Sequence, residues 1–330
     1  MTTRLSSGGI IANYRCPAAC GHCLYGCSPS AEPGYMDEPT AVRVCGQLRR
    51  LGCPGVHIGG GEPFLNVDGL VTLCQAIIAS GLSLEYIETN GAWITGDDAR
   101  DRRNLATVTR AGGGAPIMVS ADPFHVEFVP FWKPKKLIRL LEETGVSYFV
   151  WQQRYLPLLS KLDPMKTYTG AAMAEVLGHD VISQCASEYG MRFNGRALNL
   201  HRKFGKKKPA SEWLQPCGEL RNTSHFHVDY LGCYVPPGCT GMGILIDDLD
   251  VILRNWDKPL DPMNYPVLSR LLAGGTGSLL SYARTFGYEP DPAGYVSKCD
   301  LCFHIRKFLF HHARPTPPDL TPGSFYNQNY

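Results

Sequence analysis

The sequence lacks a long hydrophobic segment, an excess of charge of either sign and an export signal. Its apolar runs are far shorter than the ~20 residues that a transmembrane helix needs, and its start shows no signal-peptide core with a small-residue cleavage site. The 32 Lys and Arg residues nearly balance the 30 Asp and Glu residues, which argues against nucleic-acid binding through bulk charge. We therefore expect a cytoplasmic protein with no membrane and no nucleic-acid partner.

Cysteine is plentiful: 13 of the 330 residues are Cys. Thiols stay reduced in the cytosol, so grouped cysteines there more often bind metals or take part in catalysis than form disulfides. The odd number of cysteines also argues against a disulfide framework. The spacing of the cysteines is therefore the most informative feature of the sequence.

Short apolar stretches alternate with helix-like stretches from about residue 10 to residue 200. Residues 55–58 and 115–122 are typical of strands, residues 66–81 and 133–145 are typical of helices, and residues 191–200 look extended. We count about six such units, and strands separated by helices form parallel sheets. The pattern predicts an α/β fold built as a partial (βα)6, TIM-like barrel.

The pattern changes after about residue 205. Residues 225–235 predict a β-hairpin with Gly232 at its turn, and the Pro-rich tail is expected to be irregular. We predict a first domain over residues 1–205 and a small, cysteine-rich α+β domain over residues 206–330.

The first cysteine group is Cys16, Cys20 and Cys23, with the spacing CxxxCxxC. Three thiolates on one short loop can bind three irons of a [4Fe–4S] cube, because such clusters require soft ligands. The fourth iron is then open to a ligand from elsewhere. A zinc knuckle completed by His22 or Cys27 is the alternative interpretation.

This cysteine spacing after the first expected strand resembles the signature of the radical S-adenosylmethionine (radical SAM) superfamily. Residues 59–63 (GGGEP), 89–91 (TNG) and 120–122 (SAD) are similar to further motifs of that family. Taken singly, each is also typical of a tight turn or a helix cap. Together they follow successive strands at the edge where α/β barrels bind ligands, which favours a binding site.

The resemblance implies that the amino and carboxylate groups of S-adenosylmethionine chelate the open iron. It also implies a set of residues that contact the bound S-adenosylmethionine: His22, Gly60, Gly61, Glu62, Pro63, Thr89, Asn90, Ser120 and Asp122. His125 follows the last of these motifs, and imidazole titrates near neutral pH, so His125 is the candidate catalytic residue for proton transfer. The alternative is a loop histidine bonded to the backbone.

The second cysteine group is Cys217, Cys233, Cys239, Cys299 and Cys302. Four thiolates can hold either zinc or a fully ligated [4Fe–4S] cluster. The arrangement resembles the twitch/SPASM auxiliary cluster region of radical SAM enzymes, which implies that Cys217, Cys239, Cys299 and Cys302 are the ligands. The spacing after Gly232 departs from the family pattern. Cys233 therefore stays an alternative ligand, and zinc stays an alternative to iron.

The resemblance also implies the reaction. A reduced cluster gives one electron to S-adenosylmethionine, and the resulting 5′-deoxyadenosyl radical abstracts a hydrogen atom from a peptide or small-molecule substrate. An auxiliary [4Fe–4S] cluster favours a two-electron oxidation or a cross-link. The expected partners are a flavodoxin- or ferredoxin-type electron donor and, for a peptide substrate, a separate peptide-recognition protein. Two alternatives are a radical SAM enzyme with a structural zinc lobe and redox-neutral chemistry, and a non-catalytic iron–sulfur carrier.

Overall fold

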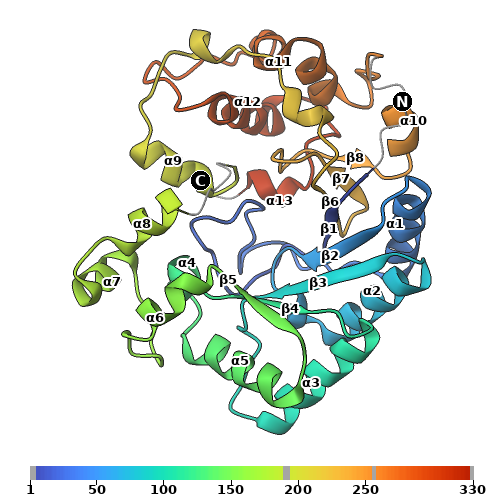
Figure 1. The fold of residues 1–330 in the computed structure, drawn as a ribbon. Coiled ribbons are helices and arrows are strands. Elements are labelled where there is room, and N and C mark those ends of the chain that lie inside the picture. The colour runs from blue at the N-terminus through green and yellow to red at the C-terminus, as the bar shows by residue number, and fades with distance from the viewer. Residues whose placement is uncertain (1–4, 189–193, 255–257, 328–330) are drawn as a thin grey trace.

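One eight-stranded sheet forms the centre of the computed structural model, which describes residues 5–188, 194–254 and 258–327. The strands lie in the order β5-β4-β3-β2-β1-β6-β7-β8 (Figure 1). Their bounds are β1 (Gly8–Ile11), β2 (Gly55–Gly59), β3 (Ser83–Thr89), β4 (Ile117–Ser120), β5 (Tyr148–Trp151), β6 (Phe226–Asp229), β7 (Cys233–Val235) and β8 (Ile244–Leu245).

Strands β1 to β5 follow one another across the sheet in chain order, and each is parallel to the next. The main helices of their connections are α1 (Glu38–Arg50), α2 (Val67–Ala79), α3 (Asp98–Ala111) and α5 (Trp132–Thr144). Parallel strands joined by helical crossovers are βα units. The predicted α/β class is therefore confirmed.

The sixth parallel strand differs from the prediction. Residues 189–193 lie outside the described residues, and the remainder of the stretch 191–200 enters a helix, α9 (Ala197–Phe204), rather than a strand. Ala197, Leu198 and Leu200 are buried, a spacing typical of one helix face and not of strand alternation. The sixth parallel strand is instead β6, which pairs with β1.

The hairpin predicted over residues 225–235 forms as β6 and β7, with Gly232 at φ +78° in the turn. β7 pairs antiparallel with both β6 and β8. The hairpin belongs to the C-terminal part of the chain, yet it extends the sheet that the N-terminal part builds (Figure 1). The two parts consequently share one sheet.

The remaining helices form two groups along the chain. Those after β4 and β5 are α4 (Pro123–Val126), α6 (Leu156–Leu159), α7 (Gly170–Leu177) and α8 (Val181–Glu188). Those of the C-terminal part are α10 (Leu249–Arg254), α11 (Pro266–Arg284), α12 (Lys298–His312) and α13 (Gly323–Tyr326), and α11 packs against α12. Among the described residues, no helix combines the length and apolar character that crossing a membrane requires.

The Pro-rich tail is more ordered than its composition suggests. One carboxylate oxygen of Asp319 accepts hydrogen bonds from the backbone N–H groups of Val267 and Leu268, at 2.8 and 2.7 Å, in the first turn of α11. Such a cap satisfies N–H groups that have no partner within the helix. Phe325 and Tyr326 are fully buried, so the end of the described chain is part of the core.

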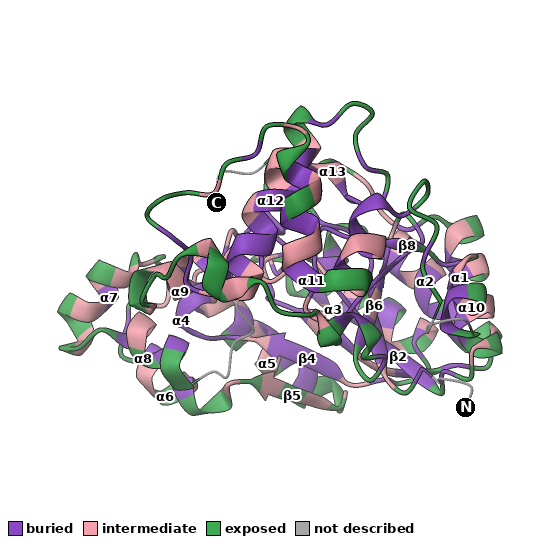
Figure 2. Cartoon of the chain, turned by 90° about the horizontal axis from the view of Figure 1, so that it is seen from above, coloured by how far each residue is buried: buried purple, intermediate pink, exposed green. Residues whose placement is uncertain are grey.

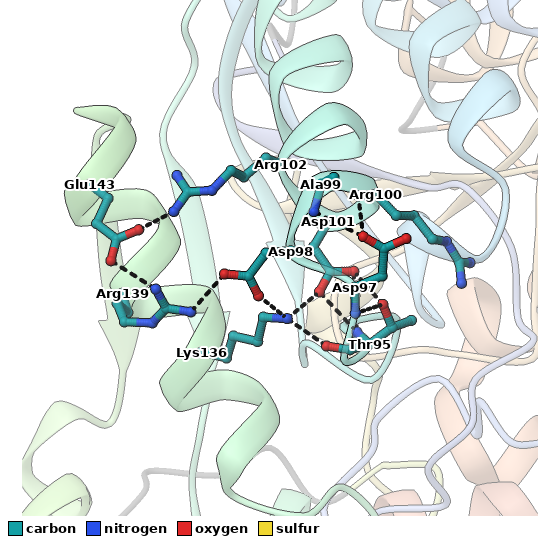
Figure 3. Close-up of polar contacts among 10 residues, drawn as sticks. All are labelled: Thr95, Asp97, Asp98, Ala99, Arg100, Asp101, Arg102, Lys136, Arg139 and Glu143. Atoms are coloured by element: carbon teal, nitrogen blue, oxygen red, sulfur yellow. Dashed lines mark hydrogen bonds and ion pairs between the residues drawn. The ribbon is translucent and has the colours of Figure 1, made fainter.

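Helices α3 and α5 are joined side by side by a chain of ion pairs (Figure 3). Lys136 lies 2.6 Å from a carboxylate oxygen of Asp98 and 2.9 Å from one of Asp101. Arg139 continues the chain by pairing with both Asp98 and Glu143. Most of these groups are exposed, so each pair contributes little on its own, but together they fix the two helices next to β4.

The two faces of the sheet have different characters. Val56, Ile58 and Ile87 belong to the main hydrophobic core. Their neighbours His57 and Glu88 line a cavity on the opposite face, as expected because side chains alternate along a strand. Figure 2 shows buried colour along most of the strands, intermediate and exposed colour on the edge strand β5, and exposed colour mainly on the outer helices and loops.

Candidate active site

A cavity of about 490 Å³ opens on the face of the sheet that carries His57 and Glu88. This volume is in the range of small-molecule sites. Most of the residues singled out in the sequence line it: Cys16, Cys20, His22, Cys23, Gly60, Gly61, Thr89, Asn90, Ser120 and His125. The structure therefore brings the cysteine loop and the ends of β2, β3 and β4 to one place.

The cysteine loop follows β1 and is closed by backbone bonds at its base. The N–H of Cys16 donates to the carbonyl of Ser28 at 3.1 Å, and the N–H of Ser28 donates to the carbonyl of Tyr14 at 3.2 Å. Within the loop, the N–H of Cys23 donates to the carbonyl of Cys20 at 3.0 Å. Local backbone hydrogen bonds thus hold the three cysteines in one loop.

The sulfur of Cys16 is surrounded by donors. It accepts from the N–H of Ala18 at 3.4 Å and from the side-chain amide of Asn90 at 3.3 Å. Burial nevertheless raises the pKa of the Cys16 thiol to about 12. A buried thiolate requires compensating positive charge, so this position suits a metal-bound thiolate better than a free one.

The pKa of the Cys23 thiol shifts in the opposite direction to that of Cys16. A hydrogen bond with the Cys27 thiol and the nearby charge of Arg196 lower the pKa of Cys23 to about 5, although burial acts in the opposite direction. Cys27 therefore lies within reach of the cluster loop, as the zinc-knuckle alternative requires. Its own pKa is raised, mainly by burial.

Glu62 is fully buried behind the glycines and does not reach the cavity surface as an open side chain. Its Oε1 accepts from the hydroxyl of Thr89 at 2.8 Å and from the N–H of Phe64 at 3.1 Å, and its Oε2 accepts from the N–H of Asn90 at 2.9 Å. A carboxylate has about four acceptor positions, so one position on Oε2 remains. Burial outweighs these bonds and raises the pKa of Glu62 to about 7.

Pro63 is also buried, and it begins the short 3-10 helix Pro63–Leu65. Its carbonyl accepts a hydrogen bond from the hydroxyl of Tyr35 at 3.1 Å. The structure therefore places Pro63, like Glu62, behind the lining of the cavity and not in it. Both residues fix the turn that presents Gly60 and Gly61.

Asp122 sits fully buried between two histidines. Its Oδ1 accepts from the N–H groups of Phe124 and His125, which caps α4, and lies 3.0 Å from Nδ1 of His125. Nε2 of His22 is 3.8 Å from the other oxygen. Burial alone would raise the pKa of Asp122, but the neighbouring histidines outweigh burial and lower it.

The pKa values of the two histidines beside Asp122 shift in opposite directions. Burial lowers the pKa of His22 to about 4, and its ring stacks on Phe124 with centroids 4.6 Å apart. Burial also acts to lower the pKa of His125, but the carboxylate of Asp122 outweighs it, so the pKa of His125 is raised. His125 lies on α4 and pairs with a carboxylate, so it is not a loop histidine bonded to backbone.

Arg196 is a cavity residue that the sequence reasoning missed. Its Nε donates to the carbonyl of Cys20 at 3.0 Å, and its terminal nitrogen donates to the carbonyl of Cys27. The preceding Gly195 has φ +54°, and a Cβ there would lie 2.2 Å from the carbonyl oxygen of Leu24. The Asn-Gly pair before Arg196 is typical of a tight turn. This pair is the feature of the sequence that could have drawn attention to Arg196.

The second cysteine group gathers from three segments. Cys217 precedes the 3-10 helix Gly218–Arg221, Cys239 follows β7, and Cys299 and Cys302 lie in the first turn of α12. The thiols of Cys217 and Cys239 are hydrogen-bonded, and Cys299 interacts electrostatically with both Cys302 and Cys217. The structure brings these four thiols together.

Cys233 lies apart from that group. Its thiol interacts with Thr321 and Asp229, and burial raises its pKa to about 12. The four grouped thiols have positive charges nearby, since Arg306 acts on Cys239 and Cys302 and Lys298 acts on Cys217. Cys233 therefore lies outside the group formed by the thiols of Cys217, Cys239, Cys299 and Cys302.

No protein-family model matches this sequence, and no curated protein matches it. Some solved structures are similar in backbone path. Native anSMEcpe with bound AdoMet has 15% identity and a TM-score of 0.45, with 94% of this chain and 97% of that chain covered. BtrN in complex with AdoMet and 2-DOIA has 17% identity and a TM-score of 0.44, with coverages of 77% and 83%. SuiB of Streptococcus suis bound to S-adenosylmethionine has 14% identity and a TM-score of 0.38, with coverages of 91% and 77%.

Proposed function

We propose that this chain is a radical SAM enzyme with an auxiliary iron–sulfur cluster. One observation carries the proposal: the three thiols of the CxxxCxxC loop share a single cavity with the motif residues at the ends of β2, β3 and β4. These motifs are separated by tens of residues in the sequence. A zinc knuckle would explain the thiols, but it would not explain why Asn90, Ser120 and His125 line the same cavity.

The residues present fit a cluster with a chelated ligand. Cys16 already has two N–H donors aimed at its sulfur, and such donors tune cluster thiolates. Behind the cavity wall, Oδ2 of Asp122 accepts no hydrogen bond from a described residue. A buried carboxylate oxygen without a donor is costly, and a small shift of the lining residue His22, whose Nε2 lies 3.8 Å away, would supply a donor when the cavity is occupied.

Each part of the chain has a task in this proposal. Cys16, Cys20 and Cys23 would hold the cluster, and when bound the cluster supplies the electron that splits S-adenosylmethionine into methionine and a 5′-deoxyadenosyl radical. Gly60 and Gly61 allow the end of β2 to pack tightly, since a Cβ at Gly61 would lie 2.1 Å from the carbonyl oxygen of Arg15. The enclosed wall orients the reactants and excludes water.

His125 is the residue we propose for proton transfer. Its Nδ1 faces Asp122 at 3.0 Å, so the other ring nitrogen is available to groups in the cavity. The carboxylate of Asp122 outweighs burial and raises the pKa of His125, which favours the protonated ring. A protonated imidazole fixed in this way can donate a proton to a product or stabilise a negative group of a substrate.

The four C-terminal thiols would hold a second [4Fe–4S] cluster that removes one electron from the substrate radical. Loss of one hydrogen atom and then one electron and one proton makes the reaction a two-electron oxidation of a peptide or small molecule. A flavodoxin- or ferredoxin-type protein would supply the first electron. Four cysteine ligands leave no open position on that cluster, which suits electron transfer.

The test is a metal count on two proteins reconstituted without oxygen. We expect about eight irons per wild-type chain and about four in the Cys16/Cys20/Cys23→Ala variant, each with matching sulfide. We also expect the wild type, reduced with dithionite, to release 5′-deoxyadenosine from S-adenosylmethionine, and the variant to release none. About one zinc and negligible iron in the variant would make the C-terminal site a zinc site. Full iron loading of the wild type without 5′-deoxyadenosine would favour a non-catalytic carrier.

A further inference from the structure

Three histidines form a second polar cluster on the cavity wall, separate from the cysteine loop. His57 lies on β2, His225 directly precedes β6, and His227 is the second residue of β6. One ring nitrogen from each lies within 4.8 Å of a ring nitrogen of the other two. All three line the cavity, and the proposed function uses none of them.

The sheet itself brings these rings together. β1 lies between β2 and β6, and Gly9 of β1 is in register with both His57 and His227. A Cβ at Gly9 would lie 2.2 Å from Nε2 of His57 and 2.8 Å from Cδ2 of His227. The glycine therefore leaves the space in which two imidazoles from non-adjacent strands meet.

The nitrogen spacing matches metal coordination. Nε2 of His57 and Nε2 of His227 are 3.3 Å apart. Two ligands on zinc at 2.0–2.1 Å in tetrahedral geometry are separated by about 3.3 Å. An N–H···N hydrogen bond would explain a pair of rings at this distance. It would not explain the third ring, whose centroid lies 5.6 Å from that of His57 and 5.1 Å from that of His227.

The surroundings supply the groups that usually support ligating imidazoles. Oε1 of Glu88 lies 3.7 Å from Nε2 of His57, and the hydroxyl of Tyr25 lies within 3.0 Å of the ring nitrogens of His227. The ring of Tyr86 stacks on His57 with centroids 4.7 Å apart and an interplanar angle of 5°. The hydroxyl of Tyr25 and the packed ring of Tyr86 hold the imidazoles in place, as such groups do around metal ions. Glu88 instead faces Nε2 of His57, the nitrogen that would bind the metal, and adds a negative charge beside it.

We propose that His57, His225 and His227 bind one divalent metal ion of the Zn²⁺ type inside this cavity, with Glu88 beside it. Imidazole is a preferred ligand for such ions. Three imidazoles leave one coordination position toward the cavity, which water or an oxygen of a bound molecule fills. The metal site does not depend on the proposed radical chemistry, because none of its three ligands comes from the cysteine loop or from the motifs around it.

The experiment uses the full chain with its cysteine sites reconstituted with iron, and Zn²⁺ is the added probe. Zinc retained after gel filtration is counted, and zinc-edge X-ray absorption reports the ligand shell. We expect one zinc per chain with nitrogen and oxygen ligands at about 2.0–2.1 Å and no sulfur near 2.3 Å. A sulfur shell, or no retained zinc, would overturn the proposal.

His225→Ala is the main variant, because His225 is exposed and its loss leaves the core intact. We expect zinc affinity to fall at least 100-fold with unchanged iron content. The matched control is His179→Ala, an exposed histidine between α7 and α8, which should retain the zinc. Equal zinc binding by wild type and His225→Ala would contradict the assignment.

Gly9→Ala gives a second, independent test, because it removes no ligand and only fills the space between His57 and His227. We expect it to weaken zinc binding while circular dichroism and iron content stay as in wild type. Release of 5′-deoxyadenosine is measured on the same samples. Zinc binding with no 5′-deoxyadenosine would sink the proposed function alone, and 5′-deoxyadenosine without zinc would sink the metal site alone.

Discussion

The two cysteine groups of this chain are built in opposite ways. Cys16, Cys20 and Cys23 come from one loop and all line the cavity. Cys217, Cys239 and the pair on α12 come from three segments and meet only when the C-terminal part folds. The backbone of a single loop holds the first group, which suits a site that exchanges its ligand. The second group is assembled by tertiary folding, so metal binding there is coupled to the stability of the C-terminal part.

Each group has one arginine beside it. Arg196 donates to the backbone carbonyl of Cys20, and Arg306 donates to the carbonyl of Thr240 and to the hydroxyl of Tyr326, both at 2.8 Å. Both cations act to lower the pKa of neighbouring thiols, as positive charge near a thiolate does. Two different architectures therefore each place a positive charge beside the thiols of a cysteine group.

The largest effect should come from removing one ligand on each side. Cys20→Ala should abolish 5′-deoxyadenosine release, by about 1,000-fold or more, because the cluster that we propose for cleavage needs all three thiolates. Cys302→Ala should leave release within about tenfold of wild type while about four irons are lost. The readouts are 5′-deoxyadenosine by chromatography and iron per chain.

The controls for that pair are Cys45→Ala, a core cysteine on α1, and Cys233→Ala, which lies apart from the thiol group. Both should keep full iron. Loss of iron in Cys233→Ala but not in Cys239→Ala would exchange the roles of these two cysteines.

The next effect concerns the turn that supports the cysteine loop. Gly195→Ala should reduce the free energy of unfolding by about 3 kcal/mol, because φ is positive and the Cβ would collide with the carbonyl of Leu24. Gly178→Ala is the matched control: its φ is also positive, but a Cβ there meets nothing within 4 Å. That variant should lose only about 1 kcal/mol. Equal losses would show that the loop does not rest on Gly195.

Local signals explain which parts of this molecule were predictable. The strand around residues 55–58 and the helix over residues 133–145 followed from periodicity and from glycine stops, and the motif residues at strand ends met in one cavity. The pairing of β6 with β1 joins residues more than 200 positions apart. No periodicity within either segment encodes such a contact.

The same limit applies to single residues. In the sequence, His57 was one polar residue in an apolar strand, and only the register through Gly9 shows that it meets His227. Arg196 was likewise invisible, because its partners are backbone carbonyls of a loop about 170 residues earlier. Motif reasoning finds side chains that act together by spacing and misses those that tertiary folding assembles.

A smaller expected effect is a pH dependence of S-adenosylmethionine binding at the first cysteine group, with no matching pH dependence of iron binding at the second. Burial raises the pKa of Glu62 to about 7, so its carboxylate is mostly ionised at pH 8 and mostly protonated at pH 6. Only the ionised form accepts charge-assisted hydrogen bonds from the hydroxyl of Thr89 and the N–H of Asn90, two residues that line the cavity proposed for S-adenosylmethionine. Affinity should therefore fall roughly tenfold from pH 8 to pH 6, as measured by anaerobic equilibrium dialysis.

Glu62→Gln is the control for this titration. Its affinity should be lower at pH 8 and nearly constant down to pH 6, while iron at the C-terminal group stays constant in both proteins. A wild-type affinity that does not change with pH would argue against a role of Glu62 in placing Thr89 and Asn90 for S-adenosylmethionine.

The smallest effect tests whether the two groups are coupled. The hydroxyl of Thr240, next to Cys239, donates to the carbonyl of Leu24, next to Cys23, at 2.8 Å. Thr240→Val should lower the free energy of unfolding by about 1 kcal/mol, and Thr240→Ser, which keeps the hydroxyl, by less. If this bond transmits order from the C-terminal lobe to the cysteine loop, its loss should matter less once Cys299→Ala has already loosened the lobe. A double-mutant cycle on thermal unfolding measures that difference. Strictly additive losses would mean that the two cysteine groups are stabilised independently, despite the bond that joins their loops.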